Sequence, residues 1–385
     1  MRTRAVAGVF AILLVTCWPL ASEPSRPTVI PVGPDREIKL PSQAAEIAVD
    51  GAIVEIDAGI YPRDSAVWRQ NDLTLRGVGG LAYLRSEGKT SDGKAIWVIK
   101  GSNTRVENIE FSGARVKDEN GAGIRQEGQG LTVVGCSFHD NQNGILSGNR
   151  PESDIVIERS EFHNNGFGDG RTHNMYIGRA KSLTLRHNYI HHAKAGHNVK
   201  TRASANYILY NRIMDEADGT ASYAIDLPDG GVAYVVGNLL QQGPNTDNSN
   251  ALVTFGVESL PVGRTHALYL VNNTLVNDFA GGGFVTGEGG AQTLSIVNNI
   301  FAGSGTAPSG AGVTNNLVSD DPALVDRAGY DYRLAGNSPA RDAGIDPGSG
   351  MGFGLTPVYQ YLHPRSLENR PRDAVLDIGA YEYSN

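Results

Sequence analysis

The stretch TLRHNYI at residues 184–190 returns as ILYNRI at 208–213 and as VVGNLL at 235–240, and this repeated phrase decides the fold. Each copy is a short apolar run, a small polar residue and a second apolar pair. Further copies are VVGCSF (133–138), VIERSEF (156–162), LVNNTL (270–275) and IVNNIF (296–301), with an eighth, VENIEF, at 106–111. The polar positions of the seven copies from 133 to 301 follow one another at steps of 23 to 28 residues, with one step of 35. A period of this size indicates one supersecondary unit per repeat.

The segments between the polar positions have strand character. They are short, rich in β-branched residues and bounded by Gly, Asn and Asp, and no stretch at helical spacing separates them. This pattern excludes alternating βαβ units and predicts an all-β, single-stranded parallel β-helix, a solenoid in which each turn pairs with the next. We expect the repeated polar residues to point inward and to hydrogen-bond from turn to turn, with no catalytic role. Cys136 belongs to this set and is expected to be a buried, inert thiol.

The N-terminus has the features of a secretory signal peptide. Residues 1–22 carry two arginines, an apolar run over 5–20 and then small residues, which is too short for a membrane span. We therefore expect a secreted or periplasmic bacterial protein with no membrane span in its mature form. Loss of the two arginines would move the net charge from −8 to about −10, which argues against a nucleic-acid partner.

The remaining chain divides into three parts. Residues 23–72 hold a leader, the first strands and a short amphipathic helix over 43–49, capped by Ser42, which is expected to cover the end of the coil. The turns run over 73–319. Residues 320–385 lose the periodicity and are expected to form a C-terminal cap and tail, and we expect a monomer.

A second strand can be aligned in each turn, and it carries the candidate site. Its apolar column is expected to point inward and contains Ile124, Ile145, Met175, Val199, Ile225, Val253 and Phe284. The residues that alternate with this column must point outward. On three consecutive turns they are Asn174, Tyr176, Asn198, Lys200, Arg202 and Asp226. Because neighbouring turns lie ~4.8 Å apart, these side chains are expected to form one patch about the size of a sugar residue.

Other polar residues flank this strand. His173, His197 and Tyr223 lie in the bends that lead into it. Three further histidines, His139, His163 and His191, instead follow the first strand in register and are expected to stack as a structural ladder. The 35-residue step implies an insertion between 241 and 266, and inserted loops of repeat proteins are commonly where ligands bind.

Several segments resemble a known family. The opening SQAAEIAVDGAIVEIDAGIY and the terminal SPARDAG and DIGAYEY resemble the pectin-lyase-like family of secreted right-handed parallel β-helix proteins, which implies a right-handed coil. NVKTRASANYILYNRI (198–213) resembles the catalytic turn of alginate-lyase and chondroitinase-B type lyases. That resemblance implies Lys200 as the base. The family places an Arg on the following turn, where Asp226 stands, and holds Ca²⁺ with acidic residues that this patch lacks, so the metal stays open.

The residue types of the patch fit β-elimination from a uronic acid. This reaction needs a cation or amide for the carboxylate, a base for the C5 proton and an acid for the leaving oxygen. A Lys whose pKa is lowered by a neighbouring Arg, or a Tyr beside a cation, can act as base. The candidate catalytic residues are Lys200, Arg202, Tyr176, His173 and His197. The candidate residues for binding the acidic polysaccharide are Asn174, Asn198, Asp226 and Tyr223.

Three other functions remain open. A C5-epimerase shares the proton abstraction, and DGRTHN (169–174) is faintly similar to the acidic-plus-His site of such enzymes. A glycoside hydrolase of the polygalacturonase type needs two carboxylates facing the scissile bond, and the aspartates between 215 and 229 do not repeat at turn spacing. A non-catalytic polysaccharide-binding solenoid would present an aromatic platform along one face, whereas the tyrosines look scattered in the sequence.

Overall fold

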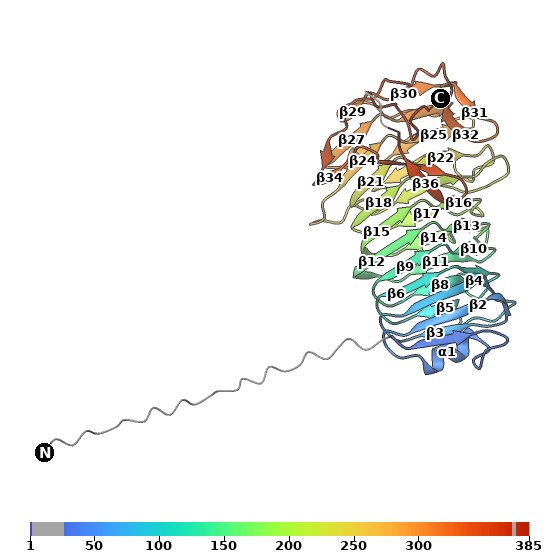
Figure 1. The fold of residues 1–385 in the computed structure, drawn as a ribbon. Coiled ribbons are helices and arrows are strands. Elements are labelled where there is room, and N and C mark those ends of the chain that lie inside the picture. The colour runs from blue at the N-terminus through green and yellow to red at the C-terminus, as the bar shows by residue number, and fades with distance from the viewer. Residues whose placement is uncertain (2–26, 372–374, 385) are drawn as a thin grey trace.

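The computed structural model describes residue 1 and the ranges 27–371 and 375–384, so the predicted signal peptide lies outside the described residues apart from Met1. The chain winds into an elongated coil with its described N-terminal end and its last turns at opposite ends (Figure 1). Each turn contributes up to three strands, and equivalent strands of successive turns pair in parallel. The fold is therefore the predicted all-β parallel solenoid. No helix of the described residues is long and apolar enough to cross a membrane.

Three ladders of parallel strands form the sides of the coil, which we call the first, second and third walls. The first wall contains β1 (Val29–Val32), β2 (Ile53–Pro62), β4 (Thr74–Arg85), β6 (Thr104–Glu107), β9 (Leu131–Val134), β12 (Arg150–Glu158), β15 (Ala180–Arg186), β18 (Ala205–Leu209), β21 (Val232–Val236), β24 (Ala267–Val271), β27 (Thr293–Val297) and β29 (Val313–Thr314). The long strands β2 and β4 continue into the second wall, where β4 pairs with β7. The second wall further contains β7 (Ile109–Ser112), β10 (Ser137–His139), β13 (Glu161–His163), β16 (Tyr189–His191), β19 (Arg212–Met214), β22 (Leu239–Gln242), β25 (Thr274–Asn277), β28 (Ile300–Gly303) and β30 (Leu317–Ser319). The third wall contains β3 (Ala66–Trp68), β5 (Ala95–Ile99), β8 (Ala122–Gln126), β11 (Asn143–Ser147), β14 (Met175–Ile177), β17 (Val199–Thr201), β20 (Ile225–Leu227), β23 (Ala251–Phe255) and β26 (Gly283–Thr286).

The repeated polar residues form the expected inward ladder at the corner between the first and second walls. Asn211 shows the pattern: its backbone N–H and its Nδ2 donate to Asn238 Oδ1 at 2.9 and 3.0 Å, and its own Oδ1 accepts from Asn188. The residue before each ladder position has a positive φ, as at Tyr210 with 56°. That bend turns the chain between walls, and the amide side chain satisfies the backbone groups that the bend leaves unpaired. The predicted histidine stack of the second wall is confirmed, with ring centroids 4.9 and 5.2 Å apart.

The short N-terminal helix α1 (Pro41–Ile47) contacts β1, β2 and β3 at the first turns. It begins two residues earlier than predicted, because Pro41 takes the first helical position, where its missing N–H costs nothing. The predicted cap at Ser42 is therefore wrong. Gln43 accepts from the Leu40 backbone N–H at 3.1 Å instead. Parallel pairing likewise starts before residue 73, since β2 already pairs with β4.

One predicted register in the third wall is wrong by a single residue. Val253 pairs with Val285 and not with Phe284. Phe284 and Val285 are both buried, so the strand lacks the alternation that would have fixed its register. The three glycines at 281–283 offered no other marker.

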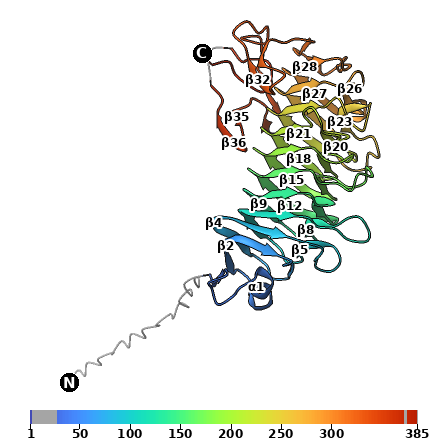
Figure 2. The same cartoon turned by 90° about the vertical axis from the view of Figure 1, so that its right-hand side faces the viewer.

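The C-terminal segment does not continue the coil. It forms the antiparallel hairpins β31 (Leu324–Asp326) with β32 (Asp331–Leu334), β33 (Ser349–Gly350) with β34 (Phe353–Gly354), and β35 (Tyr359–Leu362) with β36 (Ser366–Asn369). The last hairpin lies beside the middle turns of the coil (Figure 2). There, Tyr210 Oη accepts from the backbone N–H of Val358 at 3.1 Å. The segment thus runs back along the first and second walls.

This C-terminal segment covers an aromatic column on the outside of the first wall. Tyr207, Tyr234 and Tyr269 stack with centroids 5.0 and 5.1 Å apart, and Phe353 lies 4.6 Å from the Tyr234 ring. The expectation that the tyrosines are scattered is wrong for these three, because identical positions of successive turns bring them into one line. Tyr234 and Tyr269 are buried beneath the segment, so the column is not an open platform.

Candidate functional site

The candidate site lies on the outer face of the third wall. Tyr176 on β14, Lys200 on β17 and Asp226 on β20 are direct register partners on successive turns. Their neighbours along each strand, such as Met175 and Val199, are fully buried, so the three side chains project away from the core, as predicted. Residues 24 and 26 apart in sequence therefore lie about one turn spacing apart.

Lys200 is held as an ammonium between two carboxylates. Its Nζ lies 2.8 Å from Asp226 Oδ2 and 2.8 Å from Glu258 Oε1, and its side chain is only 10% exposed. Burial acts to lower the pKa of Lys200, but the two carboxylates outweigh burial and the pKa is raised. The sequence-based expectation of a lowered Lys200 pKa is therefore wrong, because two carboxylates lie 2.8 Å from the ammonium.

Arg202 joins the phenol to the same carboxylates. Its Nε donates to Tyr176 Oη at 2.9 Å, and its terminal nitrogens bind Asp229 and Glu258. Burial acts to lower the pKa of Arg202, but the bonds to Glu258 and Tyr176 raise it. Both cations lie 5.9 Å from the centroid of the Tyr176 ring. The phenol oxygen is thus anchored by a hydrogen bond from a permanent cation.

His173 and His197 are stacked behind these residues, with centroids 4.6 Å apart. His173 Nδ1 accepts from the backbone N–H of His197 at 3.0 Å, and His197 Nδ1 accepts from that of Tyr223 at 3.4 Å. These bonds assign the proton to Nε2 of each ring. Burial lowers the pKa of His197 to about 4 and that of His173 well below its usual value, so both rings are neutral near pH 7. His197 Nε2 lies 3.4 Å from Asp226 Oδ2.

The two predicted amides do not belong to the outward patch. Asn174 and Asn198 are buried and form an internal ladder, in which Asn174 Nδ2 donates to Asn198 Oδ1 at 2.7 Å and Asn198 Nδ2 donates to Asp215 Oδ1 at 3.2 Å. Their predicted outward orientation is wrong because both lie in the bend before the strand, where strand alternation does not apply. Burial raises the pKa of Asp215, which ends this ladder, to about 6. Tyr223 does reach the site and lies 4.9 Å from the His197 ring.

Two acidic residues of the site were missed from the sequence. Asp229 follows β20, is buried, and accepts from Ser259 Oγ at 3.1 Å as well as from Arg202. Glu258 lies in the segment after β23, inside the 35-residue step. The length of that step signalled a loop near a ligand, but nothing periodic in the loop marked Glu258 as the residue that reaches Lys200.

These carboxylates do not suit a calcium ion. Asp226, Asp229 and Glu258 each contact Lys200 or Arg202, so their charge is already balanced by fixed cations. Within the described ranges, no group of three His, Cys, Asp or Glu side chains is arranged to hold a metal. The calcium that the resemblance implied therefore does not fit here, and no step of the chemistry is routed through it.

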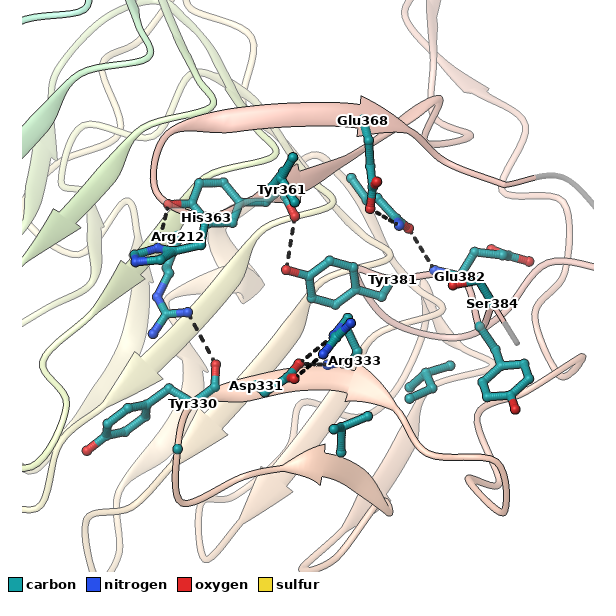
Figure 3. A pocket seen from close by; sticks show the side chains of 16 residues that line it. Arg212, Tyr330, Asp331, Arg333, Tyr361, His363, Glu368, Tyr381, Glu382 and Ser384 are labelled. Atoms are coloured by element: carbon teal, nitrogen blue, oxygen red, sulfur yellow. Dashed lines mark hydrogen bonds and ion pairs between the residues drawn. The ribbon is translucent and has the colours of Figure 1, made fainter.

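A separate cavity of about 650 Å³ lies between the C-terminal hairpins and the second wall (Figure 3). Arg212 of β19 reaches it and donates to the Tyr330 carbonyl at 3.2 Å, and Tyr381 Oη donates to the Tyr361 carbonyl at 3.0 Å. Asp331 and Arg333, which also line the cavity, form an ion pair with each other. None of the predicted site residues lines this cavity, so it is distinct from the patch on the third wall.

Comparison with known proteins places the fold. A family model described as a right-handed β-helix region matches residues 58–213. No curated protein matches the sequence. The structure is similar to that of pectate lyase Pel9A, with a TM-score of 0.63 and 11% identity over 94% of this chain and 97% of that one.

Two further solved structures are more distant. A pectin methylesterase in complex with a hexasaccharide gives a TM-score of 0.40, with 12% identity over 80% of this chain and 96% of that one. An alginate lyase of the PL6 family, AlyGC, gives 0.28, with 13% identity over 90% of this chain and 56% of that one. The likeness to pectate lyase Pel9A, at 11% identity, shows the fold alone.

Proposed function

We propose that this chain, which has the right-handed parallel β-helix fold also found in pectate lyase Pel9A, is a secreted or periplasmic polysaccharide lyase of the pectin-lyase-like type. Its substrate is a uronic-acid-containing polysaccharide, which it cleaves by β-elimination. The single observation that carries the proposal is the convergence of Tyr176, Lys200 and Arg202 on adjacent turns of one outward patch. Helix α1 serves as the cap of the coil in this proposal, and the enzyme acts as a monomer.

The two cations have a defined part in this reaction. The substrate carboxylate lies against Lys200 and Arg202, whose charges stabilise the electron density that moves toward it when C5 loses its proton. Lys200 acts as an ammonium in this scheme, because Asp226 holds it in its charged form. It takes the electrostatic role in place of the base role that the resemblance implied.

Tyr176 carries the proton. A phenolate at this position accepts from Arg202 Nε and takes the C5 proton, while the C4–O bond breaks and the electron pair of the C5–H bond becomes the C4–C5 double bond. The phenol then donates the same proton to the leaving oxygen, which regenerates the phenolate. His173 and His197 are positioning residues, since their Nδ1 atoms are engaged and their rings are nearly buried.

A glycoside hydrolase is the second candidate, and one observation favours it. Asp226 and Glu258 bind the same Lys200 Nζ, so two carboxylates do face one patch. Hydrolysis needs one of them protonated as general acid, which requires a raised pKa. Burial acts to raise the pKa of Glu258, but Lys200 and Arg202 outweigh it and the pKa is lowered. Elimination therefore suits the site better.

The test is product formation on a panel of alginate, pectate and glycosaminoglycans. We expect ultraviolet absorbance from the unsaturated product with at least one polymer. We expect Tyr176→Phe to reduce the rate by about 10² to 10⁴-fold, the usual contribution of a general acid–base group. Tyr83→Phe, a matched loss of a hydroxyl on the partly exposed β4, should leave the rate unchanged. Exchange of the C5 proton with solvent without cleavage would select the epimerase, and no signal on any polymer would refute the lyase.

A further inference from the structure

Glu258 makes an unusual contact within the patch. Its carboxylate bridges both cations, with Oε1 at 2.8 Å from Lys200 Nζ and Oε2 bonded to a terminal nitrogen of Arg202. Its side chain is 47% exposed, whereas those of Lys200 and Arg202 are 10% and 19% exposed. One carboxylate from the solvent side thus covers the two cations that the proposed reaction uses.

The other two carboxylates pair with these cations from the buried side. Asp226 pairs with Lys200, and Asp229 pairs with Arg202 and, at 3.5 Å, with Arg179. Glu258 is thus the exposed member of three carboxylates that together balance three cations. Its exchange for another carboxylate would leave the net charge of the patch unchanged, so a uronate can take its place without a new desolvated charge.

The loop that carries Glu258 is held by polar contacts more than by apolar packing. Besides the ion pairs of Glu258, Ser259 Oγ donates to Asp229 at 3.1 Å, and the Pro261 carbonyl lies 3.1 Å from His266 Nε2. The backbone N–H groups of Glu258 and Ser259 both donate to the Pro228 carbonyl, at 3.1 and 3.0 Å. Between Gly256 and Gly263, both with positive φ, the loop leaves Val257 and Val262 largely exposed. Its main apolar contact is Leu260, which lies over Gly256. Sparse apolar packing and a glycine at each end are features of a segment that can open as a hinged loop once its polar contacts are replaced.

We propose that Glu258 occupies the subsite for the substrate's carboxylate, so that a uronic acid residue binds by displacing Glu258 and swinging out residues 256–263. The identity of the ligand as a uronate rests on the proposed function. The occupied subsite itself rests on the contacts of Glu258. Specificity then follows from the two contacts that Glu258 makes with Lys200 and Arg202. The carboxylate of a uronate can make both contacts, whereas a neutral sugar has no charged group that can make them.

The test is a binding measurement that needs no cleavage. Oligomers of galacturonate, guluronate, mannuronate and glucuronate are titrated calorimetrically into the wild type, Glu258→Gln and Asp247→Asn. Asp247 is an exposed acid of the same inserted region, so its variant matches the change in net charge. We expect Glu258→Gln to bind its preferred oligouronate about 2- to 5-fold more tightly, the scale of one partly exposed ion-pair competitor. Asp247→Asn and neutral oligosaccharides should show no such gain.

Several outcomes would overturn the inference. They are equal affinity of the wild type and Glu258→Gln, an equal gain in Asp247→Asn, tightening toward inorganic sulfate alone, or no binding of any oligouronate. Tighter binding by Glu258→Gln without any unsaturated product would refute the lyase and keep the subsite. Formation of the unsaturated product together with unchanged affinity in Glu258→Gln would support the lyase and refute the subsite. Hydrogen exchange over 256–263 adds a second readout and should rise when the preferred oligomer binds.

Discussion

Replacement of Asn238 by alanine should weaken the coil far more than its size suggests. The side chain is fully buried, and its Oδ1 accepts from the backbone N–H and the Nδ2 of Asn211 at 2.9 and 3.0 Å. Its Nδ2 donates to the Ile208 carbonyl at 2.8 Å. Truncation removes these three buried hydrogen bonds. At about 1 kcal/mol for each bond, the loss is about 3 kcal/mol.

Native-state hydrogen exchange measures this loss locally, which suits a solenoid whose turns need not unfold together. We expect the free energy of opening of β18 and β21 to fall by about 3 kcal/mol in Asn238→Ala. The matched control is Asn245→Ala, in which an exposed side chain loses one bond to the Ala217 carbonyl and the cost should be below about 0.5 kcal/mol. If the two variants lose the same amount, the inward ladder does not stabilise the turns in the way described.

Three further predictions concern buried ionisable groups. Asp226→Asn should lower the pKa of Lys200 relative to the wild type, because the ammonium keeps only half-exposed Glu258 as an acidic partner; an unchanged pH dependence of Lys200 modification would contradict this. Cys136, whose pKa burial raises to about 12, should react with a thiol reagent only after denaturation, and labelling of the native protein would show that the thiol is accessible. Burial lowers the pKa of both His163 and His197 from 6.5 to about 4, so the unfolded state binds more protons between these values. Their contribution to stability is present above pH 6.5 and is lost as the pH falls toward 4, and a midpoint of urea unfolding that stays constant over this range would refute it.

The parts of the fold that repeat could be predicted from the sequence. Asn188, Asn211 and Asn238 mark the same corner on successive turns, and this fixes the register of the first and second walls. Strand alternation then placed Tyr176 and Lys200 outward on the third wall, as the structure shows. Both inferences rest on a period that the backbone itself imposes.

The remaining parts have no such period. Asn174 lies one residue before β14, where the bend and not the strand sets its direction, and the sequence gives no sharp boundary between them. Glu258 belongs to a loop whose path depends on tertiary contacts with Pro228 and Asp229. Phe353, which covers Tyr234, belongs to the C-terminal segment, and that segment has no periodic pattern. Sequence patterns could therefore place the wall but not what folds over it.

The C-terminal segment has a consequence for the order of assembly. Neighbouring turns bring together residues about 25 apart, whereas the bonds of Tyr234 to Gly350 and of Val358 to Tyr210 span 116 and 148 residues. Contacts of such long range form late, because the loop must close before they can form. During synthesis, the tyrosine column stays uncovered until the C-terminal segment has been made. A chain truncated before residue 350 should thus fold its turns but leave the tyrosine column exposed to solvent. The C-terminal segment therefore protects the coil from aggregation through this apolar surface.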